Sequence, residues 1–276
     1  MKTLFRRTSL ALALTTTLVM TAQAQDLRIS MYADITGLDP HDTSDNVSYS
    51  VQSGIFERLF QFDPQMKLEP WLATGYTSND SATEFTLTLR KGVTFQDGTP
   101  FDAEAGKANL DRLADQKKGL KRNSLYKMID KVTVLAPDQV KISLNQSFGA
   151  FINTLAHPSA VMWSPSVLKQ YPDEAQLRLH PVGTGPFKFV NWTPGKAVTL
   201  AKYDGYWRQG WPKVDQVIFS PSPEDATRVA ALKSGQVDAI WPLPSDLIAA
   251  VKQDSNLAIQ RDPSIYLYYM AINTQH

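Results

Sequence analysis

The chain has 276 residues, with 28 Lys and Arg against 27 Asp and Glu, and it contains no cysteine. Because 43% of its residues are hydrophobic and only 20% are charged, it can bury a sizeable core, which excludes a wholly disordered protein. A net charge of +1 gives no clustered basic surface for nucleic acid, so no nucleic-acid partner is expected. The lack of cysteine excludes disulfides, thiolate metal sites and cysteine nucleophiles.

The N-terminus has the features of an export signal. A basic start, an apolar stretch and a small-x-small cleavage pattern follow one another in Lys2, Arg6 and Arg7, then Ser9–Met20, then Ala22–Ala24. The apolar stretch is shorter than the roughly 20 residues that cross a bilayer, which argues against a membrane anchor. The sequence therefore predicts a signal peptide over 1–24, cleaved after Ala24, and a soluble protein in a bacterial periplasm.

The first predicted elements are a strand, a loop and a helix. Arg28–Ala33 is short and mostly apolar, which is typical of a strand, and 37–46 is dense in turn-forming residues. Apolar residues at helical spacing then predict an amphipathic helix over Val47–Phe62, with Asp45 or Asn46 as its N-cap.

The middle of the chain has antiparallel character. Phe85–Leu89 alternates apolar and polar residues, which is typical of a half-buried strand. Asp102 is placed to cap a helix that ends near Asp115. Two hairpins are predicted, one over Val132–Leu144 with its turn at 136–139 and one over Phe187–Leu200 with its turn at 193–196.

The last third switches to strand–helix–strand order. Val217–Phe219 and Val237–Trp241 read as strands, and the helix between them is predicted to start at Ser222 and stop at Gly235. This order predicts parallel strands joined by a crossover. Further on, a short helix is predicted over Asp246–Lys252, and strands are predicted over Leu257–Gln260 and Ile265–Ile272.

No set of residues points to catalysis. The chain has neither a nucleophile elbow nor a phosphate-binding P-loop, and no carboxylate pair stands out among its 27 acids. The histidines lie too far apart in sequence to form a helical metal pair, so loop or core positions are favoured for all four: His41, His157, His180 and His276.

Two further features have a structural interpretation that we favour over a functional one. Gly183–Pro186 resembles an anion-binding loop, but Pro186 lacks an N–H group and no helix follows, so a tight structural turn is favoured. The aromatic cluster Tyr203, Tyr206, Trp207 and Trp211 is predicted to pack beneath a loop rather than to stack on a ligand.

Seven short segments form a recognisable set when they are taken in chain order: Leu38–His41, Ile55–Leu59, Trp71–Ala73, Phe85–Asp102, Val182–Phe187, Tyr206–Trp207 and Thr227–Asp238. In this order they resemble the family 5 extracellular solute-binding proteins, which are the peptide-, nickel- and glutathione-binding components of ATP-driven importers. The likeness is greatest to the glutathione-binding members, through Leu120–Lys127, Ala150–Pro158 and His180–Pro186. Asn123-Ser124 departs from that pattern and leaves the exact ligand open.

The resemblance implies an α/β fold of the class II periplasmic-binding-protein type. On this basis 25–65 and 181–270 form the core of a first lobe, a mixed sheet with helices, and 66–180 form an inserted α+β subdomain. Family members are longer, so 271–276 are expected to begin the hinge to an absent second lobe. A chain truncated in this way at His276 is expected to bind its ligand weakly or not at all.

The resemblance also implies a ligand site at the cleft between the lobes. Asn46 and Tyr49 are placed at the start of a helix that faces the cleft, and Tyr49 offers an aromatic face. Arg122 and Asn123 are candidates for carboxylate and amide contacts, because a guanidinium group binds a carboxylate bidentately. His157 is expected to close one side. No catalytic residue, metal site or cofactor is expected.

The expected function is therefore transport and not catalysis. The protein is expected to be a monomer that delivers a short peptide, with glutathione as the first candidate, to the permease subunits of an ABC importer. Two alternatives stay open. One is a nickel-chelate or haem carrier on the same scaffold, which would need His41 or His157, and the other is a secreted hydrolase.

Overall fold

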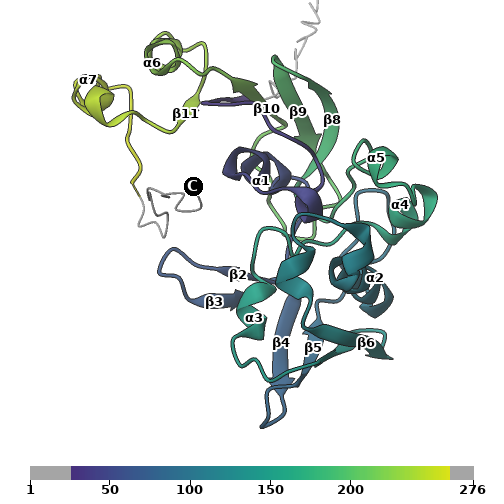
Figure 1. The fold of residues 1–276 in the computed structure, drawn as a ribbon. Helices are drawn as coiled ribbons and strands as arrows, with labels where there is room; N and C mark the ends of the chain where they lie inside the picture. The colour runs from purple at the N-terminus through teal and green to yellow at the C-terminus, as the bar shows by residue number, and fades with distance from the viewer. Residues whose placement is uncertain (1–25, 262–276) are drawn as a thin grey trace, which may run out of the picture.

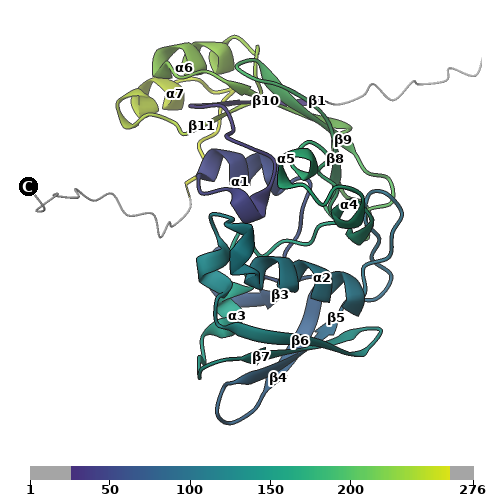
Figure 2. The same cartoon turned by 45° about the vertical axis from the view of Figure 1, so that its right-hand side comes forward.

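The computed structural model describes residues 26–261, which form two main β-sheets with α1 (Asn46–Gln52) between them (Figures 1 and 2). The larger sheet has five strands in the order β11-β1-β10-β9-β8. Strand β1 pairs in parallel with both β10 and β11, and the other pairs are antiparallel. The strands are β1 (Asp26–Met31), β8 (Phe187–Thr193), β9 (Ala197–Lys202), β10 (Gln216–Pro221) and β11 (Ala239–Trp241).

The smaller sheet lies at the opposite end of the molecule and is wholly antiparallel, with the order β4-β5-β7-β6 (Figure 2). Helix α2 (Ala103–Ala114) packs on β6 and β7. The carboxylate of Asp102 accepts a hydrogen bond from the N–H group of Ala105 (2.9 Å), so the predicted N-cap is confirmed. The strands are β4 (Ala73–Ser78), β5 (Glu84–Leu89), β6 (Ile129–Ala136) and β7 (Gln139–Leu144).

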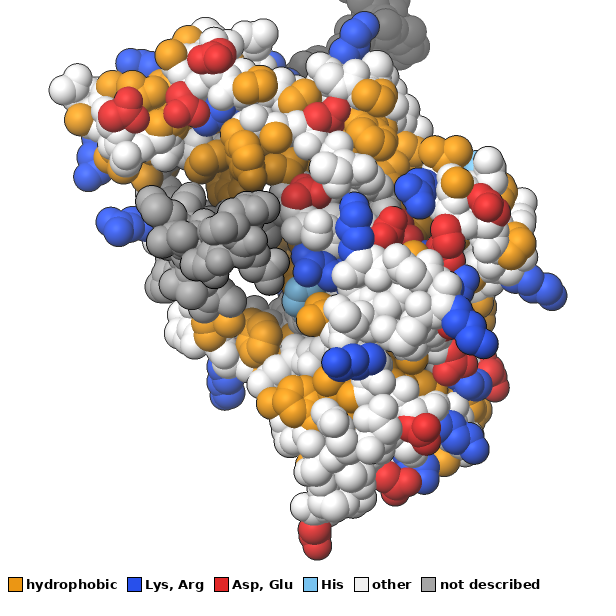
Figure 3. Space-filling model, viewed as in Figure 1, with side chains coloured by type: hydrophobic (Ala, Val, Ile, Leu, Met, Phe, Trp, Pro, Cys, Tyr) orange, Lys and Arg blue, Asp and Glu red, His pale blue; other side chains and the backbone are white. Residues whose placement is uncertain are grey.

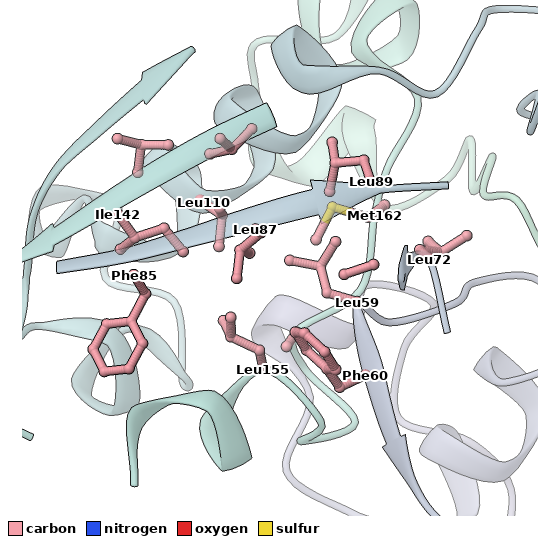
Figure 4. Packing of buried hydrophobic residues seen from close by; sticks show 14 of the residues in the cluster. Leu59, Phe60, Leu72, Phe85, Leu87, Leu89, Leu110, Ile142, Leu155 and Met162 are labelled. Atoms are coloured by element: carbon pink, nitrogen blue, oxygen red, sulfur yellow. The ribbon is translucent and has the colours of Figure 1, made fainter. Parts of the chain in front are cut away.

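The core beneath the smaller sheet follows from the alternation along β5. Phe85, Leu87 and Leu89 are buried, whereas the residues between them are only partly covered. Figure 4 shows these three side chains converging with Leu110 of α2 and Ile142 of β7. Both predicted hairpins, β6–β7 and β8–β9, are confirmed.

Short elements make the remaining connections. The helix α6 (Asp225–Lys233) joins β10 to β11, so the predicted parallel strand–helix–strand unit is confirmed. Within residues 26–261, no helix is long and apolar enough to cross a membrane. The other short elements are β2 (Phe60–Phe62), β3 (Leu68–Pro70), α3 (Phe151–Thr154), α4 (Pro165–Gln170), α5 (Glu174–Leu177) and α7 (Ile248–Lys252).

The predicted helix over Val47–Phe62 is wrong in its second half. Helix α1 ends at Gln52, and β2 follows, paired antiparallel with β3. The carbonyl oxygen of Leu59 accepts hydrogen bonds from the N–H groups of Trp71 (3.2 Å) and Ala73 (2.9 Å). The apolar spacing therefore marks residues that are buried by tertiary pairing, which overrides the helical pattern.

Three further predictions have different outcomes. Helix α6 has Glu224 as its N-cap, and the N–H group of Ser222 instead donates to the carbonyl oxygen of Met31 (2.7 Å), so the predicted start is wrong by two residues. No strand forms at Leu257–Gln260. The predicted strand Ile265–Ile272, the signal peptide and the hinge lie outside the described residues. The division into a first-lobe core and an inserted subdomain stays a prediction.

The loop at Gly183 and Gly185 packs against the backbone that follows α1, and it needs glycine at both positions. A Cβ atom at Gly183 would lie 2.2 Å from the carbonyl oxygen of Ile55, and one at Gly185 would lie 2.6 Å from that of Gly54. The amide of Gln96 donates to the carbonyl oxygens of Ile55 and Gly185 and closes the same junction. This close approach of two backbones supports the structural interpretation of the loop.

Candidate functional site

A pocket of about 250 Å³ opens beside α1. Its wall comes from α1, from the segment that follows α1, and from the loop before α4. In Figure 3, Lys or Arg side chains (blue) and a histidine side chain (pale blue) lie beside a hollow on this face of the molecule. None of the lining residues is acidic, and they are Asn46, Tyr49, Ser50, Gln52, Ser53, Phe56, Arg58, Pro158 and Val161.

Helix α1 is held in place by its N-cap. The carboxylate of Asp45 accepts hydrogen bonds from the N–H group (2.8 Å) and hydroxyl (2.9 Å) of Ser48 and from the hydroxyl of Thr36 (2.6 Å). The choice left open between Asp45 and Asn46 is therefore decided for Asp45. This frees Asn46, the first helical residue, to line the pocket.

Tyr49 and Arg122 form a fixed pair at the pocket. The Tyr49 hydroxyl donates to the carbonyl oxygen of Thr43 (2.6 Å), and Nε of Arg122 donates to the same oxygen (2.8 Å) and to the Tyr49 hydroxyl (2.9 Å). The Arg122 guanidinium lies 5.8 Å from the centroid of the Tyr49 ring. Arg122 is thus anchored by one edge of its guanidinium group, and within residues 26–261 it forms no ion pair.

His157 contacts the same tyrosine. The two rings meet edge to face with their centroids 6.0 Å apart. Nδ1 of His157 accepts a hydrogen bond from the N–H group of Ser159 (3.1 Å) and lies 2.7 Å from its hydroxyl. Burial, helped by the charges of Arg122 and Arg58, lowers the pKa of His157 to about 4. The imidazole is therefore neutral at neutral pH.

Asn123 is placed differently from the other four predicted site residues. It is 3% exposed, and its side-chain oxygen accepts a hydrogen bond from the N–H group of Leu120 (2.7 Å). Its amide nitrogen donates to the carbonyl oxygens of Leu113 (2.7 Å) and Arg112 (3.3 Å), at the end of α2. The structure thus gives Asn123 the position of a helix C-terminal cap. It brings Asn46, Tyr49, Arg122 and His157 together, and ligand contact by any of the five stays a prediction.

Arg58 is a site residue that the sequence analysis missed. It lines the pocket, and its Nη1 donates to the carbonyl oxygen of Ala156 (3.2 Å). Burial lowers the pKa of Arg58, and within the described chain the side chain has no ion-pair partner. A cation in the middle of the apolar stretch Ile55–Phe60 was the available signal.

His41, the other histidine considered for a metal or haem carrier, is fully buried in an ionic network. Nη1 of Arg112 lies 2.5 Å from Nδ1 of His41, and Nε2 of His41 lies 3.1 Å from the carbonyl oxygen of Val161. Both ring nitrogens are therefore engaged. In the described part of the chain, no group of three or more His, Asp or Glu side chains is placed to hold a metal ion.

The aromatic cluster is mostly structural, as predicted. Tyr206 and Trp207 donate to the carboxylate of Glu57 (2.7 and 2.9 Å), and the Tyr203 hydroxyl donates to the carbonyl oxygen of Phe95 (2.9 Å). Trp211 differs, because it is 52% exposed.

Replacing His157 with glutamine should make the free energy of unfolding depend less on pH below about 6.5. Because the folded-state pKa of about 4 lies below the ordinary value of 6.5, the unfolded state binds a proton first as the pH falls, and stability is lost between these values. Urea titrations from pH 7.5 to 4 should show that the variant takes up about one proton fewer on unfolding than the wild type does. His180→Gln, on the exposed surface, is the control, and an unchanged slope in His157→Gln would contradict the prediction.

Comparison with known proteins places the chain in a family. Residues 67–276 match the family model described as "Bacterial extracellular solute-binding proteins, family 5 Middle". The chain is 42% identical over 250 residues to the glutathione-binding protein GsiB of Salmonella paratyphi A, an alignment that covers 91% of this chain and 48% of that protein. The chain thus spans about half the length of the curated relatives that it matches.

Solved structures agree on the fold. The PBP AgaA of A. tumefaciens R10, in complex with agropinic acid, superposes with a TM-score of 0.77 and 32% identity, covering 83% of this chain and 46% of that one. NikZ of Campylobacter jejuni, in complex with Ni(L-His), gives a TM-score of 0.75 and 26% identity, covering 83% and 45%. With the α/β fold of these periplasmic binding proteins and a matching family model over most of its length, the chain belongs to the family 5 bacterial extracellular solute-binding proteins.

Proposed function

We propose that this chain is the first-lobe part of a periplasmic solute-binding protein that delivers glutathione, or a closely similar short peptide, to the permease subunits of an ABC importer. It acts as a monomer, closes on its ligand with a second lobe, and releases the ligand chemically unchanged. The identity with glutathione-binding relatives supports the ligand class. What these relatives bind does not by itself establish the ligand of this chain. The proposed ligand therefore also depends on the pocket described above.

The observation that carries the proposal is the charge of the pocket. Its lining contains no acidic residue, and Arg122 at its edge is tied down by Nε alone. The terminal nitrogens of such a guanidinium suit a bidentate contact with a carboxylate, which every free peptide carries. The ring of Tyr49, which lines the pocket, and the neutral imidazole of His157 then supply the apolar contact beside it.

Isothermal titration calorimetry on the product of the complete gene tests the proposal. We expect heat of binding with glutathione and recovery of intact glutathione after incubation. Nickel in the form of Ni(L-His) and haem serve as the competing ligands. Binding of either in preference to every di- and tripeptide, or no heat with any of these peptides, would contradict the proposal. A chemically altered ligand would point to the hydrolase alternative.

Replacing Arg122 with glutamine should weaken glutathione binding by roughly 10- to 100-fold, because one charge-assisted bidentate contact is lost. Calorimetry measures the change, and thermal unfolding checks that the variant is folded. Arg178 is exposed and does not line the pocket, so Arg178→Gln should leave the affinity unchanged. Equal affinities of wild type and Arg122→Gln would remove Arg122 from the site.

A further inference from the structure

The pocket holds more positive charge than the described chain neutralises. Arg58 lines it, Arg122 contacts the lining residue Tyr49, and both charges act on His157. Some other cations in residues 26–261 have ion-pair partners, as Arg112 has Asp39 and Glu174 and Lys141 has Glu84. Arg58 and Arg122 have no such partner. Both side chains are half-buried, and a half-buried charge without an ion-pair partner carries a desolvation cost, so its retention calls for an explanation.

The charge of Glu57, the acidic neighbour of Arg58 in sequence, acts on Arg58, but the two side chains form no salt bridge. The two oxygens of Glu57 instead accept four hydrogen bonds over 2.7–2.9 Å. The donors are Trp71, Thr184, Tyr206 and Trp207. The hydrogen-bonding capacity of the Glu57 carboxylate is therefore used, and the nearest carboxylate in sequence forms no ion pair with Arg58.

The two arginines are held in the same manner. Arg58 donates to the carbonyl oxygen of Ala156 through Nη1, and Arg122 donates to Thr43 and Tyr49 through Nε. In each case one nitrogen fixes the guanidinium group and the other N–H groups are left for a ligand. Fixing a long side chain before binding lowers the conformational entropy that binding must overcome.

We infer that Arg58 is a second carboxylate-binding residue, and that the pair Arg58 and Arg122 selects short peptides with two carboxylates over those with one. Such peptides carry an acidic side chain or a γ-linked glutamate in addition to the terminal carboxylate. The inference rests on the proposed function and adds to it a specificity-determining residue. It also explains why a half-buried cation is kept without an ion-pair partner.

The first test is calorimetry with glutathione and with its two monoethyl esters, each of which lacks one carboxylate. We expect Arg58→Gln to weaken glutathione binding by roughly 10- to 100-fold. For one of the two esters, Arg58→Gln should cost less than about threefold, because that ester has already lost the carboxylate that Arg58 binds. Arg58→Lys should restore part of the affinity, and Arg178→Gln should change nothing. Equal losses for glutathione and both esters would overturn the inference while leaving glutathione transport intact.

The second test needs no ligand. If Arg58 is kept for binding, then Arg58→Met should raise the melting temperature of the ligand-free protein by about 2–4 °C, because a half-buried charge without an ion-pair partner is removed. A lower melting temperature would show that Arg58 stabilises the fold, and would overturn the inference. If wild type does not bind glutathione, the proposed function fails, and this measurement still decides whether Arg58 is a structural residue.

Discussion

Replacing Glu57 with alanine is expected to lower the free energy of unfolding by about 3–5 kcal/mol, which is among the largest effects for a single side chain of this protein. Glu57 is 5% exposed and accepts hydrogen bonds from two indole N–H groups and two hydroxyls. Without the carboxylate these donors, one buried and three half-buried, lose their acceptor, and an unsatisfied buried donor costs about 1–3 kcal/mol.

The effect should be large because the four donors come from distant parts of the chain. Trp71 precedes β4, Thr184 lies in the glycine loop before β8, and Tyr206 and Trp207 follow β9. Glu57 therefore links a segment next to the smaller sheet with segments next to the larger sheet. Losing it removes a connection that no local contact replaces.

Urea unfolding at pH 7.5 measures this change, with two variants for comparison. Glu57→Gln keeps one acceptor oxygen, so its loss should be smaller than that of Glu57→Ala. Glu84→Ala removes a half-exposed carboxylate that pairs with Lys141 (2.9 Å), and it should cost under about 1 kcal/mol. A loss for Glu57→Ala no larger than that for Glu84→Ala would show that the hydrogen-bond cluster does not stabilise the fold.

The sequence predicted those parts of the fold whose cause is local. The alternation along β5, the Asp102 cap of α2 and the turns of both hairpins depend on neighbouring residues. The end of α1 could not be predicted in this way. Leu59 is buried whether it lies on a helix or beside β2, and its pairing with Trp71 and Ala73 is decided by tertiary contacts.

The candidate site shows the same limit. Resemblance to a family brought Tyr49, Arg122 and His157 forward, and the structure places these three in contact although they span more than 100 positions. The cation within Ile55–Phe60 marks Arg58 in the sequence, but its assignment to the site depends on the hydrogen bonds of Glu57 and on the lack of an acid in the pocket lining. Both are properties of the folded chain and not of the local sequence.

Replacing Arg112 with methionine is expected to cost about 3–5 kcal/mol at pH 7.5, because it leaves a buried carboxylate without its cation. Arg112 is 5% exposed, pairs with Asp39 (2.7 Å) and Glu174, and contacts His41. Burial alone would raise the pKa of Asp39, but the charges of Arg112 and His41 and their hydrogen bonds hold it below its ordinary value. The stabilisation by Asp39 is therefore present above that ordinary value and is lost as the pH falls through the lowered pKa.

The pH dependence separates this account from a simple loss of packing. In Arg112→Met the pKa of Asp39 should rise, because burial then acts without the cation, and protonation can relieve the buried charge. The deficit relative to wild type should shrink between pH 7.5 and 5. In wild type, burial and then Arg112 lower the pKa of His41 to about 4, so falling pH costs stability from 6.5 downward.

The double variant Asp39→Asn with Arg112→Met provides the decisive comparison. Since it removes both charges together, it should be more stable than Arg112→Met alone, as expected when a buried ion pair is replaced by neutral groups. Urea unfolding of the four proteins at pH 7.5 and pH 5 gives the coupling between the two residues. A double variant less stable than either single one, or a deficit of Arg112→Met that grows toward acid pH, would mean that Arg112 acts through packing of its side-chain stem and not through its charge.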